Sequence, residues 1–338
     1  MFNILSLIPS LTHANGSYYY YSLLNNEQKR IYGTILSGIK IRTKNIKMPI
    51  RPINEIAKIY NYALLDNPML FYVSSSFRQS SDLYKKKCTI LPEYIHTRSD
   101  TRAYTSSIKN YLREFDSVKD KNDIDKELYV HDYCLNNFSY DYSFDEYCHS
   151  IVGLAINKTA VCEGIAKFVK CAFDYLGVKS LVVSGKAKNP ALDGRMEGHA
   201  WNIVRIDGKT YHLDVTFDMT IKDKILRYDY FNLSDAEIKK DHVIVDNVPT
   251  CTTIANDYYS LNSLFVNSLA ELGNYFSKAM KQRKRNILVK IKGVPFSDDV
   301  ANKVMNIAEQ QYGKIGKSGT MIEMSYNSSQ MVFEIILK

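Results

Sequence analysis

The chain has 338 residues, of which 45% are hydrophobic, with six cysteines and a net charge of +8. This length has room for two or three domains, and the composition is that of globular proteins with a packed core. The cysteines are widely spread and form no Cys-x-x-Cys pair, which argues against a disulfide scaffold and gives no sign of a zinc site.

Residues 1–25 are expected to form an extended leader. Their apolar start is short, is broken by Pro9 and has no Lys or Arg before it, so it makes a poor signal peptide and is too short to span a membrane. No other stretch approaches the length of a membrane span. The location stays open between the cytoplasm, which is slightly favoured, and the cell surface or exterior.

A small α+β module is expected over residues 26–98. The pattern predicts a helix capped by Asn25 or Asn26, a strand, a helix opened by Pro52, and two further strands. The predicted ranges are 26–36, 39–47, 52–65, 69–74 and 87–95.

Two helices, over residues 106–115 and 123–137, lead into a central segment that contains Cys162. Apolar residues recur at helical spacing after Cys162, and Gly177 follows as a C-terminal cap, so Cys162 is expected at the start of a helix. Free backbone N–H groups and the helix dipole favour a thiolate there. The carboxylate of Glu163, at the same helix end, works against this stabilisation of the thiolate.

A β-hairpin is expected further along, because two alternating segments flank the strong turn signal Asp207-Gly208. With a two-residue turn, His199 lies opposite Thr216, and Asp214 shares the face of His199. The two are then diagonal neighbours, roughly 7–8 Å apart at the backbone, within reach of a hydrogen bond between their side chains. The two strands of this expected hairpin are residues 199–206 and 209–216.

Cys162, His199 and Asp214 are the residue types that thiol catalysis needs. A His in hydrogen-bond reach takes the thiol proton and returns it to the leaving group, and a carboxylate holds the His in the right orientation. Each residue alone is more often structural than catalytic. The three together, on a helix start and two paired strands, favour catalysis.

Several segments of the chain resemble the bacterial branch of the transglutaminase-like superfamily, over about residues 100–245. The resemblance implies a papain-like α+β core over residues 99–250, with helices that place the Cys at a helix start and an antiparallel sheet that carries the His and Asp. It implies that Cys162 is the nucleophile, His199 the base and Asp214 the orienting acid. The segments are Leu128–Tyr133 with Tyr140-Asp141, His149–Leu154, Ala160–Gly164, Gly198–Asn202, Tyr211–Asp218, and Tyr230–Asp235 with Asp241-His242.

Two further residues are expected on the substrate side of the site. Trp201, the one Trp of the chain, is either a core aromatic or a wall of the cleft. His149 is a candidate oxyanion donor beside the Cys162 backbone N–H. The polar stretch 186–197, just before His199, is either a loop that gates the cleft or an ordinary connection.

A C-terminal module over residues 260–338 repeats the element order of residues 26–98. Two related α+β modules are therefore expected to flank the core, positioning a substrate or packing against it. A basic run lies between the first helix and the first strand. It is either a solvated helix end or a contact for polyanions; nucleic acid is not expected, because no aromatic residues are interleaved. The predicted helices are 262–280 and 296–312, and the predicted strands are 286–292, 319–325 and 331–337. The basic run consists of Lys281, Arg283, Lys284 and Arg285.

These patterns favour a cysteine-dependent acyl-transfer enzyme that acts on amide bonds of proteins or peptides, with a peptidase as first choice. A protein-glutamine transglutaminase or a deamidase is the alternative, since all share the first half-reaction. Animal transglutaminases carry a Trp directly after the nucleophile, where this chain has Glu163. A catalytically silent binding scaffold is the alternative from another class. No cofactor is expected, and no metal, since no acidic cluster fits a calcium loop.

Overall fold

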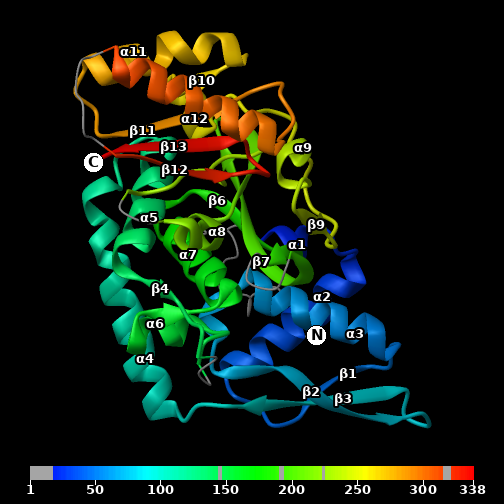
Figure 1. Cartoon of the computed structure of the whole chain (residues 1–338). Helices are drawn as coiled ribbons and strands as arrows, with labels where there is room; N and C mark the ends of the chain where they lie inside the picture. Colours follow the sequence, from blue (N-terminus) through cyan, green and yellow to red (C-terminus); the bar gives the residue numbers. More distant parts are fainter. Residues whose placement is uncertain (1–17, 144–146, 190–193, 223–224, 315–320) are drawn as a thin grey trace.

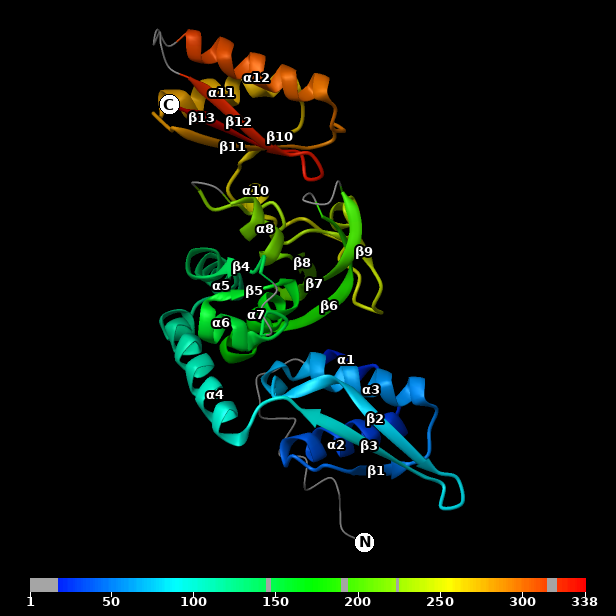
Figure 2. The ribbon, with the colours of Figure 1, turned by 60° about the horizontal axis from the view of Figure 1, so that its bottom comes forward.

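The computed structural model describes residues 18–143, 147–189, 194–222, 225–314 and 321–338. It has a mixed α+β fold in which three bodies follow one another along the chain (Figures 1 and 2). The central body lies between an N-terminal and a C-terminal body, each built from one sheet and the helices that cover it. Most of the predicted leader falls outside the described residues.

The N-terminal body is an antiparallel sheet of order β1-β3-β2 packed against two helices. Asn25 caps the first helix with a capping box completed by Gln28. That helix extends to Lys40 because Ile39 continues its buried face. The strand predicted over 39–47 is therefore wrong for residues 39–45, since β1 begins only at Ile46. The elements are α1 (Tyr19–Ser22), α2 (Asn26–Lys40), β1 (Ile46–Pro49), α3 (Ile53–Asp66), β2 (Val73–Asp82) and β3 (Lys87–Tyr94).

The central body packs helices onto one face of an antiparallel sheet of order β8-β7-β6-β9. The central helix α7 contacts β6 and β7 and buries most of its length. The helix predicted over 123–137 is confirmed, with Asn122 as its N-cap. The elements are α4 (Arg98–Arg113), α5 (Asp123–Asn137), β4 (Ser139–Tyr140), α6 (Ile151–Asn157), β5 (Thr159–Ala160), α7 (Cys162–Leu176), β6 (Lys179–Asn189), β7 (Arg195–Ile206), β8 (Lys209–Leu213), α8 (Val215–Ile221), α9 (Asp235–Ile238) and β9 (His242–Ile244).

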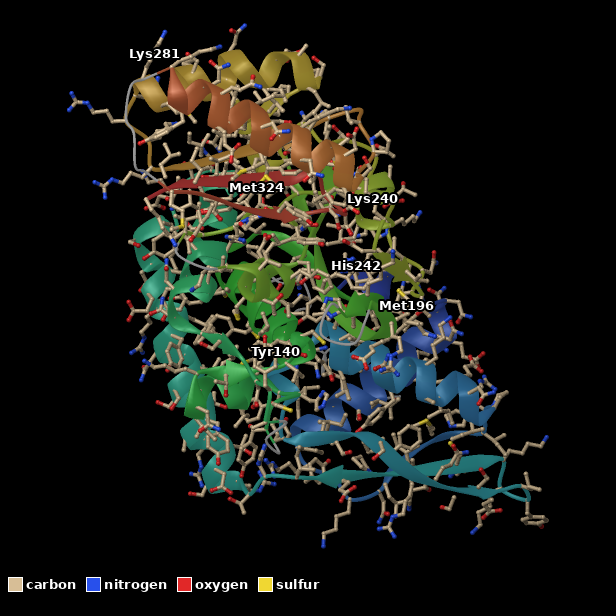
Figure 3. All side chains as sticks on the ribbon, in the orientation of Figure 1. Tyr140, Met196, Lys240, His242, Lys281 and Met324 are labelled. Carbon is tan, nitrogen blue, oxygen red and sulfur yellow. The ribbon has the colours of Figure 1, made fainter. Side chains whose placement is uncertain are left out.

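The C-terminal body has a four-stranded sheet of order β10-β11-β13-β12. The single helix predicted over 262–280 is wrong, because Phe265 and Val266 pair in parallel with β11 and split the segment. The basic run is exposed and follows α11, at the outer end of this body, where Figure 3 labels Lys281. The elements are α10 (Tyr258–Leu261), β10 (Phe265–Val266), α11 (Leu272–Lys281), β11 (Asn286–Ile291), α12 (Asp298–Gly313), β12 (Ile322–Asn327) and β13 (Val332–Leu337).

The two outer bodies share one topology. The order α2-β1-α3-β2-β3 corresponds to α11-β11-α12-β12-β13, and the sheet order β1-β3-β2 corresponds to β11-β13-β12. All four of these strand pairings are antiparallel. The repeated element order seen in the sequence therefore corresponds to a repeated strand arrangement.

Buried polar contacts fasten both outer bodies to the centre. On the N-terminal side, the Tyr20 hydroxyl donates to the Val182 carbonyl of β6 at 2.6 Å. On the C-terminal side, Lys290 of β11 pairs with Glu237 of α9 at 2.8 Å. The N-terminal body is thus attached to the central sheet, and the C-terminal body to the segment that precedes β9.

Candidate active site

Cys162 is the first residue of α7, as the sequence predicts. Val161 is the N-cap, and Gly177 ends the helix in the left-handed region at φ 78°. Gly164 lets the preceding chain approach the helix start, because a Cβ there would lie 2.8 Å from the carbonyl oxygens of Cys148 and Ser150. Cys162 is partly exposed and lies at the N-terminus of the helix.

The carboxylate of Glu163 is paired at the side of α7. Lys167, one turn later, binds it at 2.6 Å, and the exposed His149 ring lies 3.4 Å from its other oxygen. The nearby cation offsets the charge that would compete with a Cys162 thiolate. The His149 side chain is 67% exposed, and the expectation that it belongs to the oxyanion site stays a prediction.

The hairpin turn has the predicted form. Asp207 and Gly208 both have positive φ, 49° and 79°, as a type I′ turn requires. The observed pairing of Asn202 with Leu213 matches the predicted register. This register places His199 within β7, three residues before the last pair of the β7–β8 ladder.

The strand predicted to run through residue 216 is wrong beyond Leu213, and Thr216 lies in α8 rather than opposite His199. Asp214 is the N-cap of α8, because its Oδ1 accepts the Phe217 backbone N–H at 3.0 Å. Local capping therefore ends the strand. The predicted contact nevertheless forms, since Asp214 Oδ2 lies 2.7 Å from His199 Nε2.

Cys162, His199 and Asp214 interact in that order. Burial opposes a charge on His199, but the Asp214 carboxylate and a hydrogen bond with Cys162 outweigh it and raise the pKa of His199 to about 10. Burial likewise opposes the charge on Asp214, yet the neighbouring imidazoles hold its pKa well below the usual range. With Nε2 bound to Asp214, Nδ1 is the ring nitrogen left for Cys162.

Trp201 lies behind His199 and does not form an open wall of the cleft. Its side chain is only 1% exposed, because the indole packs into the face of the sheet covered by Tyr20. It stacks on the His199 ring at a centroid distance of 5.9 Å and donates from Nε1 to His212 Nδ1 at 3.0 Å. The indole therefore supports the imidazole, and the predicted substrate contact is not available in this structure.

The stretch 186–197 is mostly strand rather than loop. β6 continues to Asn189 and β7 begins at Arg195, in one continuous antiparallel register. Residues 190–193, at the tip, lie outside the described part of the chain. A gating role for a long loop is therefore not supported by the described residues.

The structure places two further residues, Asp241 and His242, at the site, and neither was among the predicted site residues. His242 Nε2 lies 3.0 Å from Asp214 Oδ2, and His242 Nδ1 lies 2.6 Å from Asp241 Oδ1. Both residues are buried, in the region that Figure 3 labels at His242. The signal in the sequence was the pair Asp241-His242, which appeared only as part of the family resemblance.

Two groups of side chains, among the residues the structure describes, have possible metal-ligand atoms within 4.8 Å of one another. In both groups, the geometry favours hydrogen bonds over a cation. Trp201 donates to His212 Nδ1, so His212 Nε2 carries the proton that faces Asp235, 2.9 Å away. In the other group, two imidazoles already share one Asp214 oxygen. The groups are His199, Asp214 and His242, and His212, Asp235 and Cys251.

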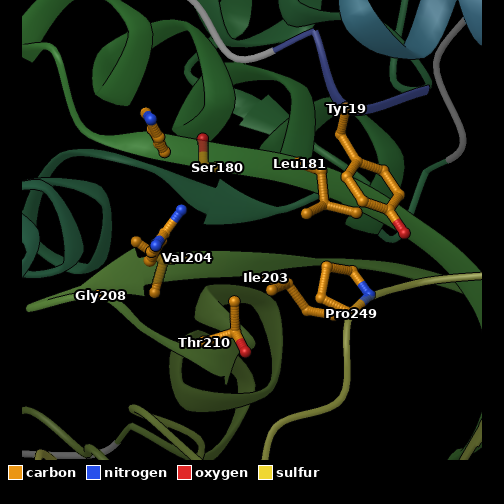
Figure 4. Close-up of a pocket in the computed structure, with 10 residues that line it drawn as sticks. Tyr19, Ser180, Leu181, Ile203, Val204, Gly208, Thr210 and Pro249 are labelled. Atoms are coloured by element: carbon orange, nitrogen blue, oxygen red, sulfur yellow. The ribbon is translucent and has the colours of Figure 1, made fainter. Parts of the chain in front are cut away.

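A separate pocket of about 280 Å³ lies at the other end of the β6–β7 pair (Figure 4). Val204, on its wall, is five residues from His199 along β7, or about 17 Å at strand spacing. None of Cys162, His199 and Asp214 lines it. The lining residues are Tyr19, Lys179, Ser180, Leu181, Ile203, Val204, Arg205, Gly208, Thr210 and Pro249.

The model of the family described as the transglutaminase-like superfamily matches residues 109–215. The central part of this chain is transglutaminase-like. The matched transglutaminase-like segment contains Cys162, His199 and Asp214. No curated protein matches the chain.

The solved structures similar to the chain include the following two. One is described as the crystal structure of a TGase, with 15% identity, a TM-score of 0.31, and coverage of 55% of this chain and 54% of that one. The other is described as a "Putative Cysteine Protease from Cytophaga hutchinsonii", with 15% identity, a TM-score of 0.28, and coverage of 43% and 63%. The alignments thus span less than two thirds of either of these proteins. Among the described residues, no helix combines the length and apolar character needed to cross a membrane.

Proposed function

We propose that this protein is a cysteine-dependent acyl-transfer enzyme that acts on amide bonds of proteins or peptides, and that it is a peptidase. The observation that carries the proposal is the chain of contacts from Cys162 at the start of α7, through His199, to the buried carboxylate of Asp214. The family match supports a papain-like cysteine enzyme, and this geometry supports the finer assignment.

In the proposed mechanism, Cys162 gives its proton to His199 and attacks the substrate carbonyl as a thiolate. The carbonyl π electrons move onto oxygen, where the Cys162 backbone N–H can donate, because the first N–H groups of a helix have no partner within it. Collapse of this intermediate breaks the C–N bond, and the His199 imidazolium protonates the leaving amine. Asp214 holds the imidazole and stabilises its positive charge.

The resulting thioester is resolved by water in a peptidase and by an amine in a cross-linking enzyme. We favour water, because Glu163 replaces the Trp that follows the nucleophile in animal transglutaminases. A transglutaminase or deamidase is the second candidate, and the same contact chain would serve it. In a silent scaffold, by contrast, this contact chain would have no function.

We also propose that different parts of the chain have different functions. Residues 99–250 form the catalytic core, and residues 26–98 and 260–338 form modules that position a protein substrate. The exposed basic run after α11 is available for a polyanionic surface. It comprises Lys281, Arg283, Lys284 and Arg285.

The proposal is tested by intact mass after incubation with iodoacetamide at about pH 6, well below the ordinary thiol pKa of about 8.5. Wild type is expected to gain one fast adduct, because Cys162 is the only cysteine that is not buried; all six lie in the described part of the chain. The adduct should vanish in Cys162→Ala and form at least tenfold more slowly in His199→Ala.

Cys171→Ala is the matched control, because Cys171 lies on the same helix and burial raises its pKa to about 12. It should label like wild type. Equal labelling of wild type and His199→Ala would mean that Cys162 is not activated, and the scaffold alternative would replace the enzyme. If Cys162 is activated, new N-termini in a peptide mixture would identify a peptidase, whereas ammonia release or amine incorporation would identify the second candidate.

A further inference from the structure

The Asp214 carboxylate is held by three donors. Its Oδ1 accepts the Phe217 N–H that begins α8, at 3.0 Å. Its Oδ2 is shared by two imidazoles, with His199 Nε2 at 2.7 Å and His242 Nε2 at 3.0 Å. The proposed triad uses only the first of these imidazoles, so the second needs an explanation.

His242 is clamped between two carboxylates. Its Nδ1 lies 2.6 Å from Asp241 Oδ1, and the other oxygen of Asp241 accepts the Tyr230 hydroxyl at 2.6 Å. Ionised carboxylates only accept hydrogen bonds, so a ring between two of them must carry a proton on each nitrogen. Burial opposes this charge, but the bonds to Asp214 and Asp241 prevail and raise the pKa of His242.

Aromatic rings fix the position of His242. The ring centroids of Phe217, Trp201 and Tyr230 lie 4.6, 5.2 and 5.7 Å from that of His242. Such rings favour a cation near their faces and leave the imidazole little freedom to turn. A fixed positive charge therefore lies behind the Asp214 carboxylate.

Five ionisable groups face His242, and they come from different elements. They are His199 of β7, His212 of β8, Asp214 at the start of α8, Tyr230 in the segment after α8, and the neighbouring Asp241. Around the proposed triad, the buried charges then alternate in sign, with Asp241 negative, His242 positive, Asp214 negative and His199 positive. His212 stays neutral, because burial lowers its pKa to about 4.

We propose that His242 is a positioning residue for the proposed reaction: as an imidazolium held by Asp241, it orients Asp214 and sets the pH range in which the pair of Cys162 thiolate and His199 imidazolium exists. This inference rests on the proposed function. A positive charge near the pair makes every proton of the pair easier to remove, and a negative charge makes it harder. Asp241 and His242 therefore act in opposite directions on the same equilibrium.

The first test is ¹⁵N NMR of the protein labelled at histidine, at pH 7.5. A ring with both nitrogens protonated is expected, and its signals should disappear in His242→Gln. His131 is the internal reference, because it is also buried between two carboxylates, Asp132 and Asp218, each at 3.1 Å. A neutral ring for His242 would overturn the inference.

The second test is the rate of Cys162 alkylation between pH 4 and 9. His242→Gln keeps one N–H for Asp214 but removes the charge, so the pH midpoint of alkylation should rise by about one unit. Asp241→Asn removes the opposite charge, but its amide oxygen can still accept the Nδ1 proton, and Asp214 still binds Nε2. His242 should therefore stay charged, and the midpoint should fall. A purely structural role would not give shifts of opposite sign.

His131→Gln is the matched control. It removes the same kind of clamped imidazole, and it should lower stability without moving the alkylation midpoint. If His242→Gln does not fold, Asp241→Asn alone carries the test. An unmoved midpoint, or two shifts of the same sign, with an activated Cys162 in wild type would overturn only the role of His242. An unactivated wild-type Cys162 would overturn the proposed function, and the role of His242 with it.

Discussion

At the scale of single residues, the candidate site combines a local feature at Cys162 with a long-range contact at His242. Cys162 at a helix start follows from the periodicity after it and from the glycine that ends α7. His242 lies 28 residues beyond the Asp214 that it contacts, and no local pattern relates the two. Trp201 shows the same limit, since its position beside His199 in sequence did not reveal which face of the sheet is covered.

Glu127 is a buried residue whose charge should control stability. It is 0% exposed, and its Oε2 accepts one hydrogen bond, from Asn232 Nδ2 at 2.8 Å. Burial raises its pKa to about 8. The folded state therefore binds a proton that the unfolded state loses near pH 4.3, and stability should fall as pH rises from about 4.3 to 8.

Glu127→Gln should remove this dependence. Relative to wild type, its free energy of unfolding should increase by roughly 3 to 4 kcal/mol between pH 4.3 and 7, at about 1.4 kcal/mol per pH unit. Urea unfolding at several pH values measures it, with the exposed Glu93→Gln as control. A difference between Glu127→Gln and wild type that stays constant with pH would show that Glu127 is ionised in the folded state.

At the scale of elements, two of the errors share one cause, which is that a side chain or a distant strand ends an element that the sequence pattern would continue. The Asp214 cap ends β8, and the parallel pairing of β10 with β11 splits the helix predicted over 262–280. The α5 helix was predicted correctly because its cap, Asn122, directly precedes it and its apolar face lies within it. Local sequence patterns thus predicted the interior of helices and strands better than their ends.

At Gly185, β6 lies so close to β9 and to Trp201 that the site geometry depends on the absence of a side chain there. Gly185 lies in β6 between His199 of β7 and Ile244 of β9. A Cβ there would lie 2.3 Å from the Val243 carbonyl oxygen and 2.6 Å from the Trp201 indole. Because one of these atoms belongs to the backbone, the clash can be relieved only by moving β9 away from β6.

Gly185→Ala should therefore separate His242 from Asp214 and destabilise the protein by about 1–3 kcal/mol, as overpacking of a core does. Its melting temperature and its Cys162 alkylation rate should both fall. Gly198→Ala is the control, since no atom lies within 4 Å of the Cβ position there. An unchanged alkylation rate in Gly185→Ala would mean that β9 can shift without disturbing the site.

At the scale of the whole molecule, the order of elements predicted the repeat of the outer bodies, but not how they attach. The attachment depends on buried ion pairs between distant segments, which no sequence period encodes. Arg227 is the main example, since it binds Asp229 at 2.7 Å and lies 3.6 Å from Glu334 of β13, with all three side chains buried. It links the C-terminal body to the segment that leads towards His242.

Arg227→Met should cost about 3–5 kcal/mol, because it leaves buried carboxylates without their cation. Urea unfolding should show the loss, and limited proteolysis should release the C-terminal body first. Lys303→Met removes an exposed ion pair with Asp299 and should change stability by less than about 1 kcal/mol. Similar stability of the two variants would show that the ion pairs of Arg227 do not hold this body in place.

Asp214 both caps α8 and binds His199, and this has a consequence for folding of the chain. One oxygen of its carboxylate closes the first turn of α8, and the other holds His199. Forming that helix and aligning that imidazole are therefore the same event. If Cys162 is the proposed nucleophile, its activation therefore has to wait until α8 has formed.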